Sequence, residues 1–287
     1  MHIKEYFTRE SPAVSFEMFP PKKDADIAGI YAALEEMASL APDFISVTYG
    51  AGGGAATNRT AMIAKDIQQR YGIPAMAHLT CITADRARIG GLLDELRSQG
   101  IENVLALRGD IPAGGSADFS GDYRHAEDLI REIRSRGDFC IGAACYPEGH
   151  IDCESTELDL ERMQRKEDAG ADFFVSQLFF ENGQYFRFLE KARARGIKLP
   201  ITAGVMPFLG RAQIERMIFM CGASLPSRII KLLHRYENDP VSLRQAGIRY
   251  AAEQLEGLLA GGVDGVHIYT MNKSDIAGAC MRHIGRV

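Results

Sequence analysis

A regular alternation of two kinds of segment constrains the fold of this chain more than any other feature. Short runs of β-branched, aromatic and small apolar residues alternate with longer segments whose apolar residues recur at helical spacing. The short runs predict eight strands, at Ala13–Phe19, Phe44–Tyr49, Ala75–Leu79, Asn103–Leu107, Cys140–Ala144, Asp172–Gln177, Pro200–Ala203 and Val263–Tyr269. The longer segments predict helices at Ile27–Ala41, Thr57–Tyr71, Ala84–Gln99, Ala126–Arg136, Ser155–Ala169, Asn182–Arg195, Arg211–Cys221 and Val241–Gly261, with a last helix from about Ser274.

Glycine marks the junction between helix and strand in most of these units. A glycine at a helix end supplies the left-handed conformation that turns the chain back toward a strand. The glycines placed in this way are Gly72, Gly100, Gly137, Gly170, Gly196 and Gly262. Eight such units predict a parallel sheet that closes into a single α/β fold, a (β/α)8 (TIM) barrel over residues 1–287. The alternative is an open doubly wound sheet, but Gly50–Gly54 lacks the spacing of a dinucleotide-binding fingerprint. We expect one catalytic domain and no regulatory domain.

Composition and charge narrow the classes of protein. A net charge of −5 without a basic stripe argues against a nucleic-acid-binding protein. We see no secretion signal and no apolar run long enough to span a bilayer, so we expect no membrane association. The six cysteines form no Cys-x-x-Cys pair, and Cys145, His150 and Cys153 make only a weak metal set. Packed thiols in a reducing cytoplasm, and no metal, are therefore expected.

A carboxylate interrupts the first predicted strand. Glu17 lies within the apolar run Val14–Phe19, directly before Pro20 and Pro21. Burying an ionised carboxylate without a partner is costly, so Glu17 either faces water at a sheet edge or is a candidate acid or base. Its position in the strand does not decide between these two possibilities.

Other predicted strands also end in polar residues, at the end where barrel enzymes carry their chemistry. Taken alone, each has a structural explanation: His78 as a core histidine, or Arg108 and Asp110 as an ion pair. Seven strands that end in this way indicate a shared polar mouth over an apolar barrel. No lysine stands alone in a strand, which weakens the case for a Schiff-base aldolase. Hydrogen-bonding groups and tyrosines suit a large, flat heteroaromatic ligand better than a small phosphosugar.

Eight segments in order resemble the signatures of one enzyme family, the methylenetetrahydrofolate reductases. The resemblance runs from about residue 15 to residue 281, and its length is that of the short bacterial form. The segments are Ser15–Lys22, Ser46–Ala51, His78–Cys81, Ala106–Asp110, Ala144–His150, Arg165–Ala171, Ser176–Phe180 and Tyr269–Asn272. It implies a (β/α)8 flavoprotein that reduces 5,10-methylenetetrahydrofolate to 5-methyltetrahydrofolate, with FAD carrying a hydride from NADH or NADPH to the folate in a ping-pong sequence.

The resemblance also assigns roles to residues. Glu17 looks like the general acid that protonates the bridging nitrogen of the folate, which requires a carboxyl that stays protonated near neutral pH. Asp110 matches a carboxylate that lies beside the flavin and the pterin, and Gln177 matches a residue that touches the folate. The implied FAD contacts are Thr48, Tyr49, His78, Arg108, Gly109, Asp110, Ala126, Tyr146, His150, Asp159, Arg165 and Lys166. The implied substrate contacts are Glu17, Asp110, Gln177, Phe208, Tyr269 and Lys273.

Two positions depart from the family pattern. Lys273 stands where the family is expected to have an arginine. The lysine ammonium would therefore replace a guanidinium that can bind a folate carboxylate through two hydrogen bonds. The segment Pro207–Arg211 differs from the expected loop, in which an aromatic packs on the folate, and Phe208 is the candidate substitute.

Two alternatives remain open from the sequence: a cofactor-free barrel lyase or aldolase, and a pterin- or flavin-binding subunit of an electron-transfer complex. A homo-oligomer is expected, and a partner protein is a third candidate electron donor besides NADH and NADPH.

Overall fold

The computed structural model describes residues 1–21, 26–49, 55–110 and 121–287, with only the backbone at 55–58. The predicted loop Gly50–Gly54 and the last residue of the first signature segment, Lys22, lie outside the described residues.

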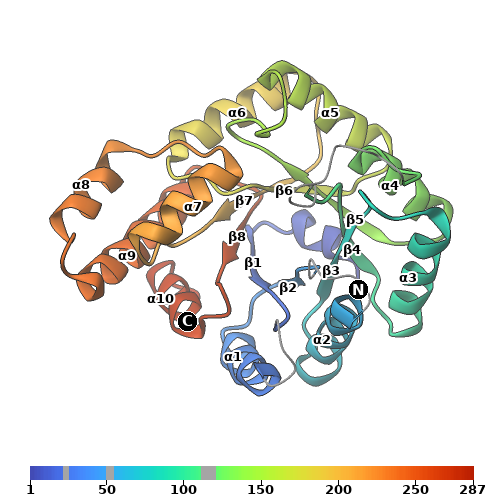
Figure 1. Cartoon of the computed structure of the whole chain (residues 1–287), viewed down its shortest axis with the longest axis horizontal. Helices are drawn as coiled ribbons and strands as arrows, with labels where there is room; N and C mark the ends of the chain where they lie inside the picture. Colours follow the sequence, from blue (N-terminus) through green and yellow to red (C-terminus); the bar gives the residue numbers. More distant parts are fainter. Residues whose placement is uncertain (22–25, 50–54, 111–120) are drawn as a thin grey trace.

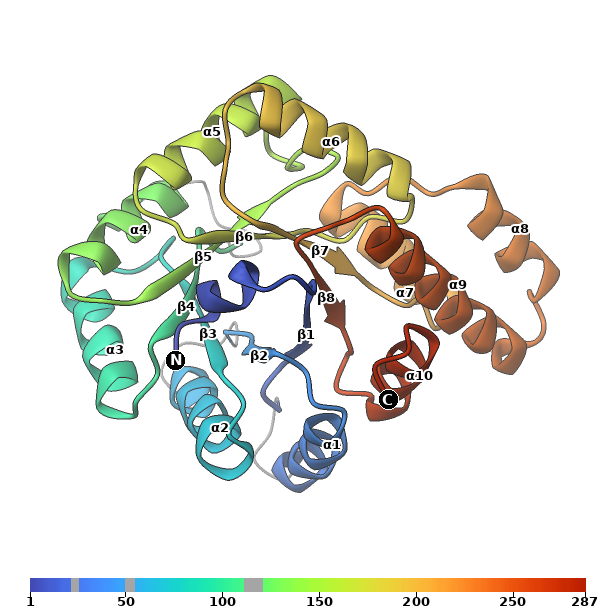
Figure 2. The same cartoon turned by 180° about the vertical axis from the view of Figure 1, so that it is seen from behind.

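Eight parallel strands close into a barrel in sequence order, which confirms the predicted fold and excludes the open sheet. Figures 1 and 2 show the helices as a ring around these strands. The strands are β1 Ala13–Met18, β2 Phe44–Val47, β3 Ala75–Thr80, β4 Asn103–Leu107, β5 Cys140–Cys145, β6 Phe173–Ser176, β7 Ile201–Val205 and β8 Gly265–Tyr269. The helices are α1 Ile27–Ser39, α2 Ala55–Tyr71, α3 Arg86–Ser98, α4 Ala126–Ser135, α5 Thr156–Asp168, α6 Asn182–Ala194, α7 Arg211–Cys221, α8 Ser227–Arg235, α9 Pro240–Ala260 and α10 Ser274–His283.

The glycines predicted to end helices do so in the expected conformation. All six have positive φ, from 67° at Gly72 to 146° at Gly137. A side chain at such a position would be strained, and glycine avoids that strain because it has no Cβ. These glycines therefore set where each helix stops and the next strand enters the barrel.

The N-terminal end of the barrel is closed by a 3-10 helix, η1 (Ile3–Thr8), that the sequence reading did not predict. Figure 2 shows this dark blue helix across the strands. Ile3 is buried with Phe44 and Phe173 in one apolar cluster inside the barrel, and the ring of Phe7 lies 5.1 Å from that of Phe173. Apolar packing thus fills most of this end, and the buried Asn103 fixes η1 there by accepting from the backbone of Ile3.

The chain between β7 and β8 carries an extra helix, α8, that was also not predicted. With α7 and α9 it encloses a second apolar cluster that contains Phe208, Ile229 and Tyr250. In the described part of the chain, no helix is both long enough and apolar enough to cross a membrane.

The contact between α9 and the loop after β7 leaves no room for a side chain at Gly247. A Cβ built there would overlap the carbonyl oxygen of Phe208. We expect Gly247→Ala to lower the free energy of unfolding by roughly 1–3 kcal/mol, because the loop backbone must move to accommodate the methyl group. Gly29→Ala is the control: Gly29 is also helical but has no atom within 4 Å of such a Cβ, so we expect a gain of up to about 1 kcal/mol. Urea unfolding of the two variants measures the difference, and equal effects would contradict the close contact.

Candidate active site

A cavity of about 60 Å³ lies between the C-terminal ends of β4 and β5, the first turn of α4 and one face of α5. We call it the β4–β5 cavity. Six of the residues predicted to contact FAD line it together: Arg108, Ala126, Tyr146, His150, Asp159 and Lys166. They come from segments spread over almost sixty residues of sequence, and the barrel brings them to one wall because its strands end at the same level.

The charged groups of this cavity are held by specific contacts. Arg108 donates to Asp152 at 2.8 Å, and not to Asp110 as in the alternative structural explanation of these two residues. Lys166 is only 8% exposed, and its ammonium donates to the carbonyl of Ala144 at 2.8 Å. Burial lowers the pKa of Lys166 and raises that of Asp159, and each opposes the shift of the other. The cationic groups of Arg108 and Lys166 are thus held in place at the wall of the β4–β5 cavity, and do not lie on a solvent-exposed helix face.

His150 is held as a neutral ring next to Tyr146. Its Nδ1 accepts from the backbone of Asp152 at 3.0 Å, and its backbone donates to Asp159 at 3.1 Å. Burial and the nearby Arg108 lower the pKa of His150. The rings of Tyr146 and His150 meet edge to face with centroids 4.6 Å apart, and burial raises the pKa of Tyr146. The wall therefore offers an aromatic surface beside its cations.

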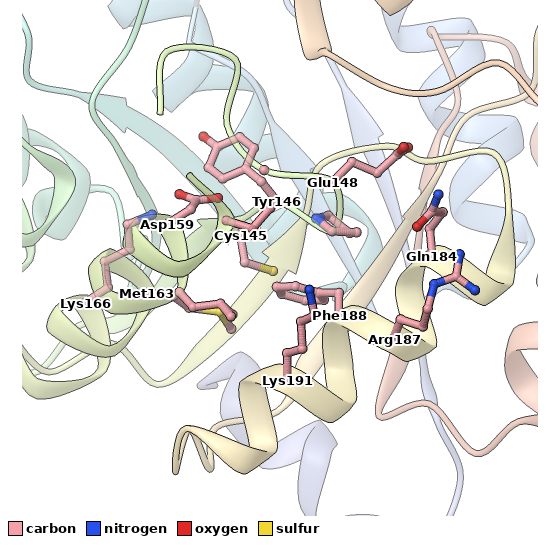
Figure 3. A pocket seen from close by; sticks show the side chains of 14 residues that line it. Cys145, Tyr146, Glu148, Asp159, Met163, Lys166, Gln184, Arg187, Phe188 and Lys191 are labelled. Carbon is pink, nitrogen blue, oxygen red and sulfur yellow. The ribbon is translucent and has the colours of Figure 1, made fainter. Parts of the chain in front are cut away.

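A larger cavity of about 260 Å³ lies on the other side of α5, between that helix and α6. Figure 3 shows its side chains, with Tyr146, Asp159 and Lys166 shared with the β4–β5 cavity. Arg187 and Lys191, both on α6, also line it. Helix α5 thus lies between the two cavities, and its side chains Asp159 and Lys166 line both of them.

Glu17 points into the mouth of the barrel, where two histidines face it. Its Oε2 lies 3.7 Å from Nε2 of His78 on β3 and 3.9 Å from Nε2 of His267 on β8. The Glu17 side chain is 19% exposed, so it is neither a wet edge residue nor fully enclosed. The backbone around it is held by β8, because Thr270 donates to the carbonyl of Glu17 at 2.7 Å. Of the two possibilities left open by the sequence, the water-facing sheet edge is excluded because the barrel is closed, and the role as acid or base stays a prediction.

Burial lowers the pKa of His78 to about 4, with Glu17 opposing the shift and His267 adding to it. A folded pKa below the unfolded value of about 6.5 means that the unfolded chain takes up the proton first. His78 therefore stabilises the fold fully above about pH 6.5, and this contribution is lost as the pH falls toward 4. We expect His78→Asn to remove up to about 3 kcal/mol of the pH dependence of unfolding in that window. Urea unfolding at several pH values measures it, and parallel curves for both proteins would contradict the buried neutral state.

Other predicted FAD contacts lie around this mouth. Tyr49 and His78 line a small apolar cavity together, apart from the β4–β5 cavity. The backbone N–H of Thr48 donates to the carbonyl of Met18, the last residue of β1, at 2.9 Å. Gly109 has a φ of 90°, and a Cβ there would lie 3.1 Å from Cβ of Thr80. Asp110 is exposed and is the last described residue before 111–120.

Arg165, like Asp110, is a predicted FAD contact that the structure places at the surface. It donates to Glu161 one turn earlier on α5, its side chain is 51% exposed, and it lines neither cavity. Its role at the flavin stays a prediction of the resemblance.

The predicted substrate contacts fall into two groups. Gln177 follows β6 and Tyr269 ends β8, on either side of β7, and the Tyr269 hydroxyl reaches across to donate to the carbonyl of Ser176 at 2.7 Å. Lys273 is exposed at the start of α10. The prediction for Phe208 is wrong in this structure, because its ring is completely buried and packs beside Tyr250 with centroids 6.0 Å apart. A ring enclosed by α7, α8 and α9 cannot stack on a ligand at the mouth.

Several residues of the site were missed by the sequence reading. His125 and Arg162 line the β4–β5 cavity and contact each other at 3.3 Å, with Arg162 donating to Nδ1 of the ring. Arg162 lies four residues before Lys166, which is the helical spacing that brings two cations to one face. Within the described ranges, no group of three or more His, Cys, Asp or Glu side chains is placed to hold a metal ion.

Comparison with known proteins adds the family. The model of the family "Methylenetetrahydrofolate reductase" matches residues 2–285. A 5,10-methylenetetrahydrofolate reductase of Pectobacterium carotovorum is 34% identical over 273 residues, covering 95% of this chain and 90% of that protein. The enzyme of the same name from Escherichia coli is 32% identical, with the same coverage. Methylenetetrahydrofolate reductase (NADH) 1 of Arabidopsis thaliana is 34% identical over 99% of this chain but only 50% of its own length.

Solved structures agree with the fold. A protein from Clostridium thermocellum, described as binding two copies of 5-methyl-5,6,7,8-tetrahydrofolic acid, matches with a TM-score of 0.63 at 16% identity over 99% of both chains. A dihydropteroate synthase from Coxiella burnetii matches with a TM-score of 0.55 at 12% identity, over 96% of this chain and 93% of that one. At these identities the likeness concerns the barrel alone. The family model and the bacterial relatives, which cover nearly the whole chain, show that it belongs to the methylenetetrahydrofolate reductase family.

Proposed function

We propose that this protein catalyses the flavin-dependent reduction of 5,10-methylenetetrahydrofolate to 5-methyltetrahydrofolate. The observation that carries the proposal is the β4–β5 cavity, where six residues assigned to the flavin by resemblance line one wall. Membership of the family and the reductase names of the bacterial relatives support the same reaction.

The residues present fit FAD. Its pyrophosphate is dianionic, and Arg108, Arg162 and Lys166 supply cations along the cavity wall. Tyr146 offers an aromatic surface, and Gly109 leaves space where a side chain would collide with Thr80. His78 brings a buried Nε2 without a hydrogen-bond partner among the described residues, as expected for an atom that awaits a ligand. When bound, FAD would supply hydride transfer from the reduced donor to the folate.

The side chains at the mouth would act on the folate. Glu17, in its protonated form, gives its proton to the bridging nitrogen, so that the five-membered ring opens to an iminium ion that accepts the hydride. Asp110 would stabilise this cation through its negative charge, and Gln177 would hold the pterin by hydrogen bonds. Tyr269 and Lys273 would complete the folate site. On its inner side Glu17 faces two histidines, His78 and His267.

Three further properties belong to this proposal. The electron donor is NADH or NADPH rather than a partner protein, in line with the plant relatives named for NADH. Residues 1–287 act as one catalytic barrel in the cytoplasm. The chain forms a homo-oligomer, for which sedimentation measurements of the purified protein are the test.

The first test is spectroscopic. We expect the purified protein to take up FAD, and NADH or NADPH to bleach the flavin absorbance under anaerobic conditions. A protein that takes up no FAD would instead favour the cofactor-free lyase. A flavin that is bleached by the donor but never reoxidised by the folate would favour the electron-transfer subunit.

A further inference from the structure

Glu17 shares the interior of the barrel with a hydrogen-bonded group that none of its assigned roles explains. In the sheet register, Ser15 of β1 is opposite His267 of β8, and Glu17 is opposite Ser46 of β2. Side chains two residues apart on a strand point to the same face, so Ser15 lies directly below Glu17 inside the barrel. His267 lies between these positions and is completely buried.

The contacts of His267 define its tautomer. Ser15 Oγ is 2.7 Å from Nδ1 of His267 and 3.2 Å from the carbonyl oxygen of Val266, and Ser46 Oγ is 3.2 Å from Nε2. A serine has one proton, so all three contacts are hydrogen bonds only if Ser15 donates to Val266 and accepts from Nδ1–H. In the neutral ring, Nε2 then carries no proton and accepts from Ser46. The opposite tautomer would satisfy only two of the three contacts.

The second histidine is also an uncharged ring near Glu17. The pKa of His78 is lowered to about 4 by burial, so its ring is neutral near pH 7. Its Nε2 is buried, has no hydrogen-bond partner in the described part of the chain, and lies 3.7 Å from Oε2 of Glu17. Neutral imidazole nitrogens from β3 and β8 therefore converge on one carboxyl oxygen.

The remaining surroundings of Glu17 offer no compensation for a negative charge. Across the described residues, no Lys or Arg nitrogen lies within 4.0 Å of its carboxyl. Tyr269, on β8, keeps its proton because burial raises its pKa well above the ordinary value, and its hydroxyl is already donated to Ser176. Ser46 of β2 directs its proton to His267. A carboxylate here would be only partly solvated and would face two neutral rings with no cation to compensate its charge, whereas a neutral carboxyl needs no such compensation.

We propose that His267, fixed by Ser15 and Ser46, is a positioning residue that keeps Glu17 in its proton-donating form by turning an acceptor nitrogen toward it. The inference rests on the proposed function, since it explains how the general acid of that reaction holds its proton. The closing distance of 3.9 Å leaves the carboxyl free to rotate toward a bound folate. His267 acts through Glu17 and does not touch the substrate.

The first test needs neither cofactor nor substrate. In protein labelled with ¹⁵N-histidine, we expect one ring to show a protonated Nδ1 and an unprotonated Nε2 throughout pH 6–8, and its signals to be absent from His267→Gln. A protonated Nε2, or an imidazolium that titrates in this range, would overturn the proposal. If His267→Gln does not fold, Ser15→Ala identifies the ring instead, because it removes the acceptor of Nδ1–H and must shift those signals.

The second test follows the two half-reactions separately. Ser15→Ala frees His267 to turn a donor toward Glu17, which favours the carboxylate. We expect the rate of folate-dependent flavin reoxidation to fall with rising pH about one pH unit lower than in the wild-type protein. At a fixed alkaline pH the rate is then up to about tenfold lower. Reduction of the flavin by NADH should be unchanged. The control is Thr202→Val, which removes a buried interior hydroxyl with no partner among the described residues, and it should shift neither profile.

Two outcomes of this second test would overturn the positioning role: an unmoved pH profile in Ser15→Ala, or an equal loss in both half-reactions. Failure of the wild-type protein to bind FAD or turn over folate would instead reject the proposed function. The tautomer of His267 would still be tested independently by the ¹⁵N spectra.

Discussion

Glu17→Gln is expected to leave reduction of the flavin by NADH intact and to slow its reoxidation by 5,10-methylenetetrahydrofolate roughly 10²- to 10⁴-fold, the usual contribution of a general acid. Glutamine has nearly the same shape but no acidic proton. The folate ring would then have to open without protonation of its bridging nitrogen, while transfer of a hydride to the flavin requires no such proton.

Anaerobic stopped-flow absorbance separates these two half-reactions in the same preparation. Glu17→Asp is the matched variant, because it keeps an acid but shortens the side chain, and we expect it to retain part of the folate half-reaction. Equal slowing of both half-reactions by Glu17→Gln would reject the acid role and would indicate a general disturbance of the mouth.

Lys166→Met is expected to weaken binding of FAD roughly 10- to 100-fold, as the loss of a hydrogen bond to a charged group predicts. Methionine keeps most of the volume of the buried side chain but removes the ammonium that lies between the two cavities. Arg131→Met is the control, because Arg131 is an exposed cation on α4, paired with Asp128, that lines neither cavity. Titration of the apoprotein with FAD, followed by flavin fluorescence, measures the dissociation constants.

The stability of this variant must be measured as well, because removing Lys166 leaves Asp159 buried without its compensating charge. The double variant Lys166→Met with Asp159→Asn removes both charges and is expected to regain stability but not FAD affinity. Wild-type affinity in a folded Lys166→Met protein would contradict the assignment of the cavity to the flavin.

Local rules were sufficient to predict the barrel. The glycines that end helices and the apolar runs that form strands are signals contained within a few residues. Their positions in the sequence therefore show where each helix and each strand lies along the chain. The helices η1 and α8 were missed for opposite reasons. The first has only two turns of 3-10 helix, and its apolar residues find their partners only in the closed barrel. The second is short and lies between Pro226 and Pro240 in a segment that resembles a linker.

The sequence predicted site residues that directly follow a strand. It did not predict positions that depend on tertiary packing. Tyr146 and His150 follow a strand, so they had to reach the mouth. The burial of Phe208 depends on a close approach by Gly247, almost forty residues later, which no local pattern reveals. The sequence assigned no role to His267, because its contacts depend on two serines of other strands.

Reoxidation of the reduced flavin by 5,10-methylenetetrahydrofolate, without oxygen, tests the central claim most directly. The account predicts that the flavin absorbance returns and that one 5-methyltetrahydrofolate forms for each flavin reoxidised. A flavin that NADH or NADPH reduces fully, but that stays reduced with saturating folate and yields no methyl product, would contradict it.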